Sequence, residues 1–160
     1  MVMTDIETKR LHLHVKTFAE LEQGMHEGDE MSVDFYHAYQ YHRERIPGYD
    51  TEWFRLWDFY LEGTTKRIGG ACFKGQPDKD GQVEIGYGID EEYQNRGYAT
   101  EAIAALVNMA IQYPGVQAVL FEIEKTNGPS KRVAEKLEAR LVEEREGNLR
   151  YRVEKTTKNA

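Results

Sequence analysis

Hydrophobic and polar residues alternate along two short segments, one near each end of the chain. Residues 11–15 read Leu-His-Leu-His-Val, and residues 149–153 read Leu-Arg-Tyr-Arg-Val. A period of two is typical of a strand with one buried face. Two further apolar runs, 67–73 and 83–89, flank a segment dense in Gly, Asp and Lys, which predicts an antiparallel hairpin with a long exposed loop.

Helical periodicity replaces the strand pattern after residue 89. Apolar residues recur at three- and four-residue spacing from Ala99 to Ala110, and the pattern ends at Tyr113-Pro114-Gly115. The apolar run 116–123 then predicts a buried strand. A strand, a helix and a strand in this order imply a right-handed crossover and a locally parallel strand pair.

A second helix is expected to begin at Pro129, because Pro is favoured in the first turn of a helix. Its apolar face would consist of Val133, Ala134, Leu137 and Leu141.

Residues 18–60 are polar with interspersed aromatic side chains, and we predict that they are mostly helical, with a break at Ile46-Pro47-Gly48. Aromatic residues at helical spacing usually belong to a core, but some of these could line a ligand pocket. The aromatic residues are Tyr36, Tyr39, Tyr41, Trp53, Phe54, Trp57, Phe59 and Tyr60.

Length and composition predict one globular domain over residues 1–160, with a loose tail at 156–160. The net charge of −7 argues against general nucleic-acid binding and suits a cationic or amine-bearing ligand. Cys72 is the only cysteine, so no intrachain disulfide can form, and its apolar strand makes it a core residue rather than a nucleophile. Without a secretory segment or a membrane-length apolar run, we expect a cytoplasmic protein without membrane partners.

The most informative segment is Gln94–Ala99, which reads Gln-Asn-Arg-Gly-Tyr-Ala between a predicted strand and a predicted helix. The first amides of a helix have no internal partner, and the helix dipole places partial positive charge there. Gly97 would let the backbone approach a phosphate without a Cβ in the way. We therefore predict that the backbone amides of residues 94–100 cradle a pyrophosphate.

The segment resembles the acyl-CoA loop of the GCN5-related N-acetyltransferase (GNAT) superfamily, whose signature is Gln/Arg-x-x-Gly-x-Gly/Ala. Gln94, Gly97 and Ala99 match its three defined positions, and the strand before and the helix after are those of the family. The resemblance covers about residues 68–153.

Within that superfamily, the chain is similar to the ribosomal-protein and peptide N-terminal acetyltransferase branch, which is RimJ/RimL-like. The strand 84–87 (Glu-Ile-Gly-Tyr) and the Asn127-x-x-Ser130 turn carry this similarity. The first third of the chain matches mainly through Thr8–Leu11.

The resemblance implies an α/β (α+β) fold: a mixed, mostly antiparallel, twisted sheet with a central splayed parallel strand pair, flanked by helices. Residues 83–140 would form the acyl-CoA-binding core, and residues 18–60 would supply the helices that set acceptor specificity. The family uses acetyl-CoA as acyl donor, needs no metal, and transfers the acetyl group directly to a primary amine. Dimers are common in it.

The acceptor is left open by the resemblance: a peptide or protein N-terminus, or a small amine such as a polyamine, an amino acid or an antibiotic. An alternative from a different class is a non-catalytic acyl-CoA sensor of the same fold.

Pantetheine in this family lies between the splayed strands, held by strand amides. Gly86 and Gly88 agree with this, because glycine inside a strand often marks the close approach of a ligand. Glu84 is the candidate general base, acting through a water, since a carboxylate is unusual on an interior strand. The alternative is an outward-facing Glu84 paired with a lysine.

The proton for the leaving thiolate has no clear source. Many relatives place a tyrosine where this chain has Ala134, so Asn127 and Ser130 are the candidates near the sulfur. Asn127 could equally cap a helix. Three tyrosines remain as unranked alternatives: Tyr87, Tyr98 and Tyr151.

Two further features concern the helix after Asn127. Arg132, Lys136 and Arg140 form a basic stripe that could approach the 3′-phosphate or adenine end of CoA or could simply be solvated. Glu138-Ala139 stands where the family has Gly-Phe, so the helix is expected to run on by a turn.

Taken together, the strand, the loop and the helix after Asn127 give one predicted cofactor-binding set. Its members are Tyr87, Gly88, Ile89, Gln94, Asn95, Arg96, Gly97, Tyr98, Ala99, Thr100, Asn127 and Arg132.

His12 and His14 share one face of the first predicted strand and could ligate a metal together. No third ligand with suitable spacing appears in the sequence, so we interpret them as solvent-facing strand residues and expect no metal.

Overall fold

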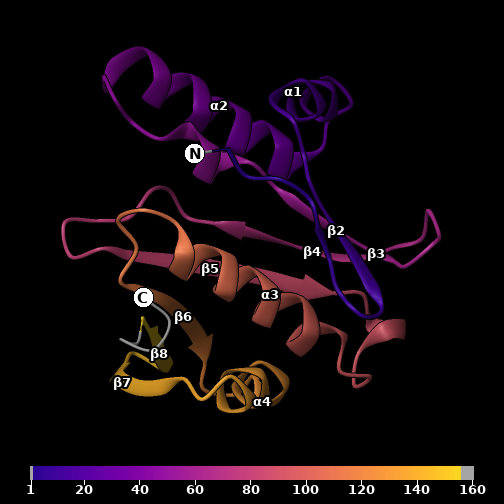
Figure 1. The fold of residues 1–160 in the computed structure, drawn as a ribbon, viewed down its shortest axis with the longest axis vertical. Helices are drawn as coiled ribbons and strands as arrows, with labels where there is room; N and C mark the ends of the chain where they lie inside the picture. Colours follow the sequence, from indigo (N-terminus) through magenta and orange to yellow (C-terminus); the bar gives the residue numbers. More distant parts are fainter. Residues whose placement is uncertain (1, 156–160) are drawn as a thin grey trace.

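The strands of the computed structural model, which describes residues 2–155, form one eight-stranded sheet (Figure 1). They are β1 (Ile6–Glu7), β2 (Leu11–Val15), β3 (Trp57–Leu61), β4 (Arg67–Phe73), β5 (Gln82–Ile89), β6 (Ala118–Glu124), β7 (Arg140–Arg145) and β8 (Asn148–Glu154). The spatial order is β1-β2-β3-β4-β5-β6-β8-β7.

Four α-helices and two short 3-10 helices complete the described part of the chain. They are α1 (Phe18–His26), α2 (Glu30–Arg45), η1 (Thr51–Phe54), η2 (Glu91–Tyr93), α3 (Tyr98–Gln112) and α4 (Gly128–Lys136). In Figure 1, α1 and α2 form a pair at the top. Helix α3 crosses in front of the sheet, and α4 lies at the bottom, below α3.

Strands β5 and β6 are parallel, whereas the other neighbouring strands in the described sheet are antiparallel. The parallel register runs only from Gln82 opposite Ala118 to Glu84 opposite Leu120. Beyond that point β5 continues along β4, and β6 continues along β8. The two strands therefore splay apart at mid-length, which confirms the predicted mixed sheet with a parallel pair flanked by helices.

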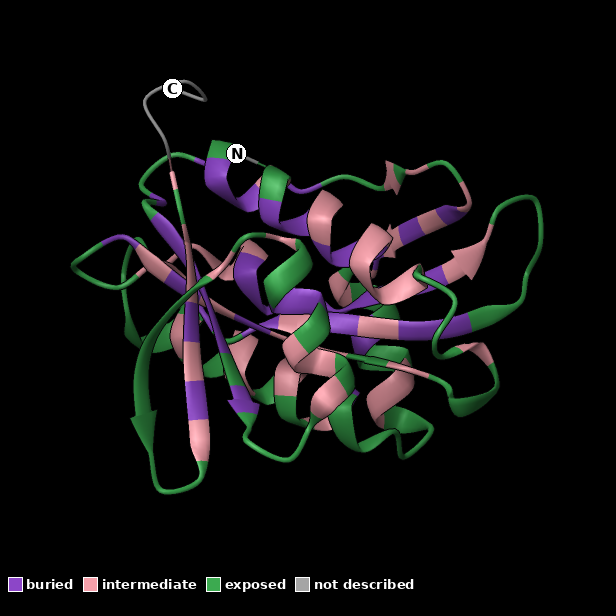
Figure 2. Cartoon of the chain, turned by 90° about the horizontal axis from the view of Figure 1, so that it is seen from below, coloured by how far each residue is buried: buried purple, intermediate pink, exposed green. Residues whose placement is uncertain are grey.

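The core lies between the sheet and α3. Figure 2 shows the buried residues concentrated on the strands and on one side of this helix. Burying a large aliphatic side chain contributes about 1.5–3 kcal/mol, so this helical face holds α3 firmly on the sheet. Its buried residues are Ala102, Ile103, Leu106, Val107, Ala110 and Ile111.

The prediction that residues 18–60 are mostly helical with a break at 46–48 is confirmed as far as Phe54 by α1, α2 and η1, and α2 ends at Arg45, next to the predicted break. The prediction is wrong at its end, where Trp57–Leu61 is strand β3. Trp57 and Phe59 are fully buried there, at positions two apart, which is the strand period. The density of aromatic residues on both sides concealed that short alternation in the sequence.

The expected extension of the last helix is also wrong. Helix α4 ends at Lys136, because Glu138 adopts the left-handed conformation (φ 58°) that glycine usually takes at a helix end. The amide of Ala139 donates to the carbonyl of Ala134 over 3.0 Å, which closes the helix. Leu141, expected on the helix, instead lies in the edge strand β7 and is half-exposed.

Two predicted features concern the ends of the chain and the membrane. The tail expected to be loose, 156–160, lies outside the described residues. Within residues 2–155, none of the helices combines the length and the apolar character needed to cross a bilayer.

The turn between β1 and β2 is fastened to the first turn of α3. Glu101 accepts hydrogen bonds from the Thr8 hydroxyl at 2.6 Å, the Arg10 amide at 2.8 Å and Arg10 Nε at 2.7 Å. Burial alone would raise the pKa of Glu101, but these bonds hold it below its usual value. Arg10 Nη1 also donates to the Arg96 carbonyl, so the first strands brace the start of α3.

We predict that Glu101→Ala lowers the free energy of unfolding by about 1–3 kcal/mol at neutral pH, because it removes a carboxylate that accepts three hydrogen bonds. A carboxyl group with a lowered folded-state pKa stabilises the fold above its unfolded pKa, and this contribution fades as pH falls through the folded pKa. The difference from wild type, measured by urea denaturation, should therefore shrink in acid. Glu22→Ala is the control, since Glu22 is exposed and its partners, His26 at 3.8 Å and Tyr36, are side chains of the neighbouring surface helices. Equal losses in both variants would contradict the bracing role.

Candidate active site

The loop after β5 is shaped by two left-handed residues and one side-chain hydrogen bond. Asn95 has φ 62° and Gly97 has φ 82°. Gln94 Nε2 donates to the Ile89 carbonyl at 2.8 Å, which ties the loop to the end of the strand. Gly97 is the N-cap of α3 and offers no side-chain cap, so the first amides of the helix remain available to a ligand.

A cavity of about 400 Å³, here called the loop cavity, lies against this loop and extends to the start of α4. Of the twelve predicted cofactor-binding residues, only Arg96 does not line it. The sequence interpretation missed Tyr93, Pro129, Val133 and Lys136, of which Lys136 had been placed in the basic stripe. The predicted residues that line the cavity are Tyr87, Gly88, Ile89, Gln94, Asn95, Gly97, Tyr98, Ala99, Thr100, Asn127 and Arg132.

The α4 side of the loop cavity supplies polar groups and positive charge. Asn127 Oδ1 accepts the amide of Ser130 at 3.1 Å, so Asn127 caps the helix while lining the cavity. Arg132 and Lys136 lie one turn apart on the same wall. Arg140 does not continue this stripe, because it begins β7 and pairs with Glu154.

A second cavity of about 580 Å³, here called the sheet cavity, lies over the face of the sheet that carries Cys72, Gly86 and Gly88. Ile85, which alternates with these glycines, is buried in the core with α3. Cys72 lines this cavity and is half-buried instead of lying in the core; burial raises the pKa of its thiol.

Charged groups of both signs line the sheet cavity. Asp58, whose side chain is 9% exposed, lies 2.8 Å from Arg67 Nε and 3.6 Å from Lys16 Nζ. Asp29 and Asp90 also line this cavity. These residues come from distant parts of the sequence and became neighbours only through strand pairing, so no local pattern could have revealed them.

The two cavities share one wall, formed by Tyr87, Gly88 and Ile89. The Tyr87 hydroxyl is buried and makes no hydrogen bond of normal geometry within residues 2–155. Burial raises the pKa of this phenol, and the nearby Ser130 side chain partly offsets that rise. Tyr87, which lines both cavities, therefore carries a buried hydroxyl near the Ser130 side chain.

The other two tyrosines considered from the sequence are placed differently. Tyr98 lines the loop cavity with the Arg10 guanidinium 4.4 Å above its ring. Tyr151 is buried in the core and lines neither cavity. Of these three tyrosines, Tyr87 alone lines both cavities.

Glu84 is the last residue of the parallel register and lines neither cavity. Its carboxylate, 19% exposed, lies 2.5 Å from Lys74 Nζ and 4.0 Å from Arg150 Nη2. The hydrogen bond to Glu84 raises the pKa of Lys74. The lysine pairing considered as an alternative is therefore present, and the role of Glu84 as base stays a prediction.

Comparison with known sequences points to one family. Residues 14–140 match the family model described as acetyltransferase (GNAT) domain. The chain is also 31% identical over 111 residues to the uncharacterized N-acetyltransferase YjdG of Bacillus subtilis (strain 168). That alignment covers 69% of this chain and 66% of the relative, slightly less than two thirds of its length.

Solved structures share the fold at low sequence identity. RimL, a ribosomal L7/L12 alpha-N-protein acetyltransferase in complex with coenzyme A, superposes with a TM-score of 0.69 at 15% identity, over 94% of this chain and 97% of that chain. FdhC, a nucleotide-linked sugar GNAT, gives 0.71 at 13% identity, over 97% and 92%. A GNAT-family acetyltransferase from Bacillus anthracis gives 0.66 at 19% identity, over 94% and 98%. The splayed parallel pair, the loop and the matching family model together show that this chain belongs to the GNAT acetyltransferase family.

Proposed function

We propose that this protein is an N-acetyltransferase that takes the acetyl group of acetyl-CoA and transfers it directly to a primary amine, either a peptide or protein N-terminus or a small amine. The observation that carries the proposal is that a cavity suited to a phosphate-bearing donor and a second cavity with acidic groups adjoin at Tyr87–Ile89, so that a thioester in one and an amine in the other can meet there.

The loop cavity would bind the donor. The amides of residues 95–100 suit a pyrophosphate, and Arg132 with Lys136 adds positive charge on the other side of the cavity. The Gln94 amide, predicted to take part, donates instead to the Glu91 carbonyl at 3.2 Å.

In β5 the backbone groups of even-numbered residues face β4, because the Lys74 amide donates to the Glu84 carbonyl and the Asp90 amide donates to the Ile68 carbonyl. The amides of Tyr87 and Ile89 therefore face the side where β5 leaves β6 and can bond to the pantetheine chain, whereas the Gly88 amide, predicted to do so, faces β4. Acetyl-CoA, when bound, supplies a thioester whose carbonyl these strand amides can polarise.

The sheet cavity would bind the acceptor. Asp29, Asp58 and Asp90 favour a protonated amine at its entrance, although Lys16 and Arg67 neutralise part of that charge. Residues 18–60 contribute part of this wall, in keeping with their expected role in specificity. Glu84 lies on the same face of β5 as Gly86 and would accept the amine proton through a water.

The groups at the junction would handle the leaving sulfur. Tyr87 holds a buried, protonated hydroxyl that is suited to donate a proton to the thiolate. Ser130 lies beside it, and Asn127 fixes the position of Ser130 by capping α4.

Two alternatives give different results in solution. A non-catalytic acyl-CoA sensor would bind acetyl-CoA but release no thiol with any member of a broad panel of amines. A small-molecule enzyme would favour polyamines, amino acids or antibiotics over unmodified peptides in the same assay. The homodimer and the cytoplasmic location stay predictions.

Acetyl-CoA is expected to bind the purified protein with micromolar affinity in calorimetry, with ATP and NAD as silent controls. Gly97→Val should weaken this binding at least about tenfold, because a branched residue is strained at φ 82° and its Cβ would lie 3.3 Å from Arg10 Nη2, so that the loop would have to shift. Gly63→Val is the matched control, since Gly63 also has a positive φ (72°) but lines neither cavity. Equal affinity in both variants would refute the pyrophosphate cradle.

Glu84→Gln should lower kcat/KM about 100-fold at neutral pH, because a neutral amide cannot accept the amine proton. The loss of kcat/KM relative to wild type should be smaller in alkaline buffer, because more of the amine substrate is already unprotonated there. Glu122→Gln is a suitable control: Glu122 also lies 4.0 Å from Arg150 but sits on β6. Indistinguishable pH–rate profiles for the two variants would remove Glu84 from the mechanism.

Tyr87→Phe is expected to reduce kcat about 100-fold with little change in acetyl-CoA affinity, since it removes the buried hydroxyl and keeps the ring. Tyr151→Phe makes the same chemical change in the core and should keep near-normal turnover. Thiol release measures the effect on kcat, and calorimetry measures the effect on acetyl-CoA affinity. Full turnover by the Tyr87→Phe variant would show that Tyr87 does not donate the proton to the thiolate.

A further inference from the structure

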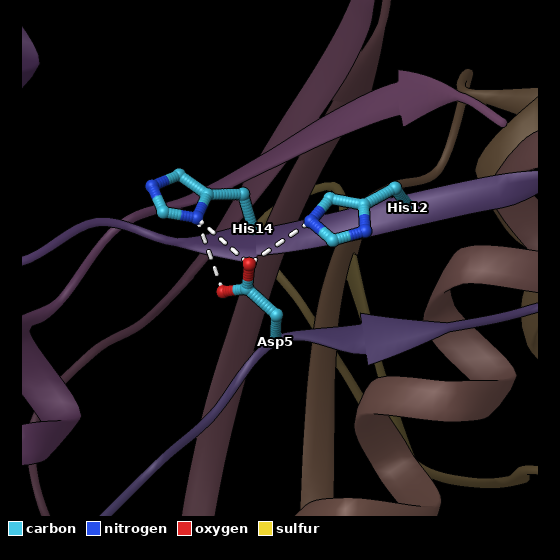
Figure 3. A group of neighbouring side chains, drawn as sticks. All are labelled: Asp5, His12 and His14. Atoms are coloured by element: carbon cyan, nitrogen blue, oxygen red, sulfur yellow. Dashed lines mark hydrogen bonds and ion pairs between the residues drawn. The ribbon is translucent and has the colours of Figure 1, made fainter. Parts of the chain in front are cut away.

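A second polar cluster lies at the β1 edge of the sheet, outside both cavities. Asp5 leads into β1, whereas His12 and His14 lie two residues apart on β2 and point toward its carboxylate (Figure 3). We propose that these three side chains form a binding site for a divalent transition-metal ion of the zinc class.

The ligand atoms already converge. Asp5 Oδ2 lies 2.9 Å from His12 Nε2 and 3.0 Å from His14 Nδ1. One ligand atom from each residue can be chosen so that all three lie within 4.8 Å of one another. Tetrahedral zinc with ligands at about 2.1 Å would separate them by roughly 3.4 Å, so small side-chain rotations suffice.

The carboxylate is fixed in position by the backbone. The Val15 amide donates to Asp5 Oδ1 at 2.9 Å. His14 Nδ1 lies 3.1 Å from Oδ1 and 3.0 Å from Oδ2, whereas His12 Nε2 faces Oδ2 (Figure 3). The third ligand is therefore supplied by packing of the segment before β1 against β2. This is why spacing along the sequence did not reveal it.

The outer nitrogens of both rings also have carboxylate partners. Glu7 pairs with His12 Nδ1, and Glu20 lies 2.9 Å from His14 Nε2. A metal-bound histidine usually donates its other N–H to a carboxylate, which fixes the tautomer and strengthens the ligand. Both histidines here have that second partner, from β1 and from α1.

The arrangement also resolves a conflict of hydrogen bonding. A neutral imidazole has one N–H and one lone pair, yet all four ring nitrogens face carboxylates. With a divalent ion between Asp5 and the two rings, each lone pair faces the metal and each N–H faces a glutamate. Two imidazolium rings could satisfy the same contacts without metal, and the experiment below separates the two cases.

The ion would take three protein ligands and keep one position for water. Imidazole nitrogens with a carboxylate favour zinc, nickel or cobalt over magnesium and calcium. The site would join the segment before β1, strand β2 and, through Glu20, the first turn of α1. His14 is directly opposite Asp58 in the β2–β3 register, so the metal site lies on the strand next to the one that brings Asp58 to the sheet cavity.

The test is a calorimetric titration of the full chain with Zn²⁺, after purification without a histidine tag and treatment with a chelator. One ion per chain should bind with micromolar or tighter affinity. Co²⁺ should produce a visible absorption band of a low-symmetry site, a signature that surface adsorption does not give. Absence of both signals in the wild-type protein would show that the cluster holds protons only.

Variants locate the site. His12→Ala and Asp5→Asn should each weaken Zn²⁺ binding at least about 100-fold. Glu20→Gln should weaken it about 10–100-fold, since Gln still serves in the capping box that Glu20 forms with Thr17. His26→Ala removes an exposed histidine of α1 and should change nothing. Equal affinity in His12→Ala and His26→Ala would overturn the proposal.

Discussion

Hydrogen bonding between β5 and β6 stops at Glu84 and Leu120, and the arrangement of the site depends on that stop. Each strand continues beyond it but is held by its other neighbour, β5 by β4 and β6 by β8, so neither can turn back to close the gap. The facing edges keep backbone donors and acceptors that another group must satisfy. An extended polar chain such as pantetheine has the shape and the amides to do so.

The protein is acidic overall, yet its proposed donor carries negatively charged phosphates, and the local structure of the loop cavity accounts for this. The chain carries a net charge of −7, yet the loop cavity suits an anion, because it relies on helix amides and on two basic residues of α4. Arg10 pairs with Glu101, which neutralises its charge, and its Nη1 donates a hydrogen bond to the Arg96 carbonyl of the loop. The attraction for phosphate thus arises over a few ångströms and does not require a basic surface.

The residues proposed to bind the donor lie together where the sequence predicted, because they are contiguous in the chain. A strand, a glycine-containing loop and an amphipathic helix follow one another, and eleven of the twelve predicted cofactor residues line one cavity. The sheet cavity was not predictable in the same way, since Asp58, Arg67 and Lys16 meet only through strand pairing. Asp5 was not predicted as a third ligand beside His12 and His14 for the same reason. The end of α4 was mispredicted because Glu138 itself adopts the conformation usually left to glycine.

The wall between the two cavities is a single β-strand, and its middle residue, Gly88, has no side chain. The separation of two reactants across such a wall is fixed by main-chain dimensions, which substitutions elsewhere hardly alter. In the proposed reaction, side chains around the sheet cavity could therefore change while the main chain keeps the alignment of donor and acceptor. A fold of this kind can acquire new acceptors without rebuilding its donor machinery.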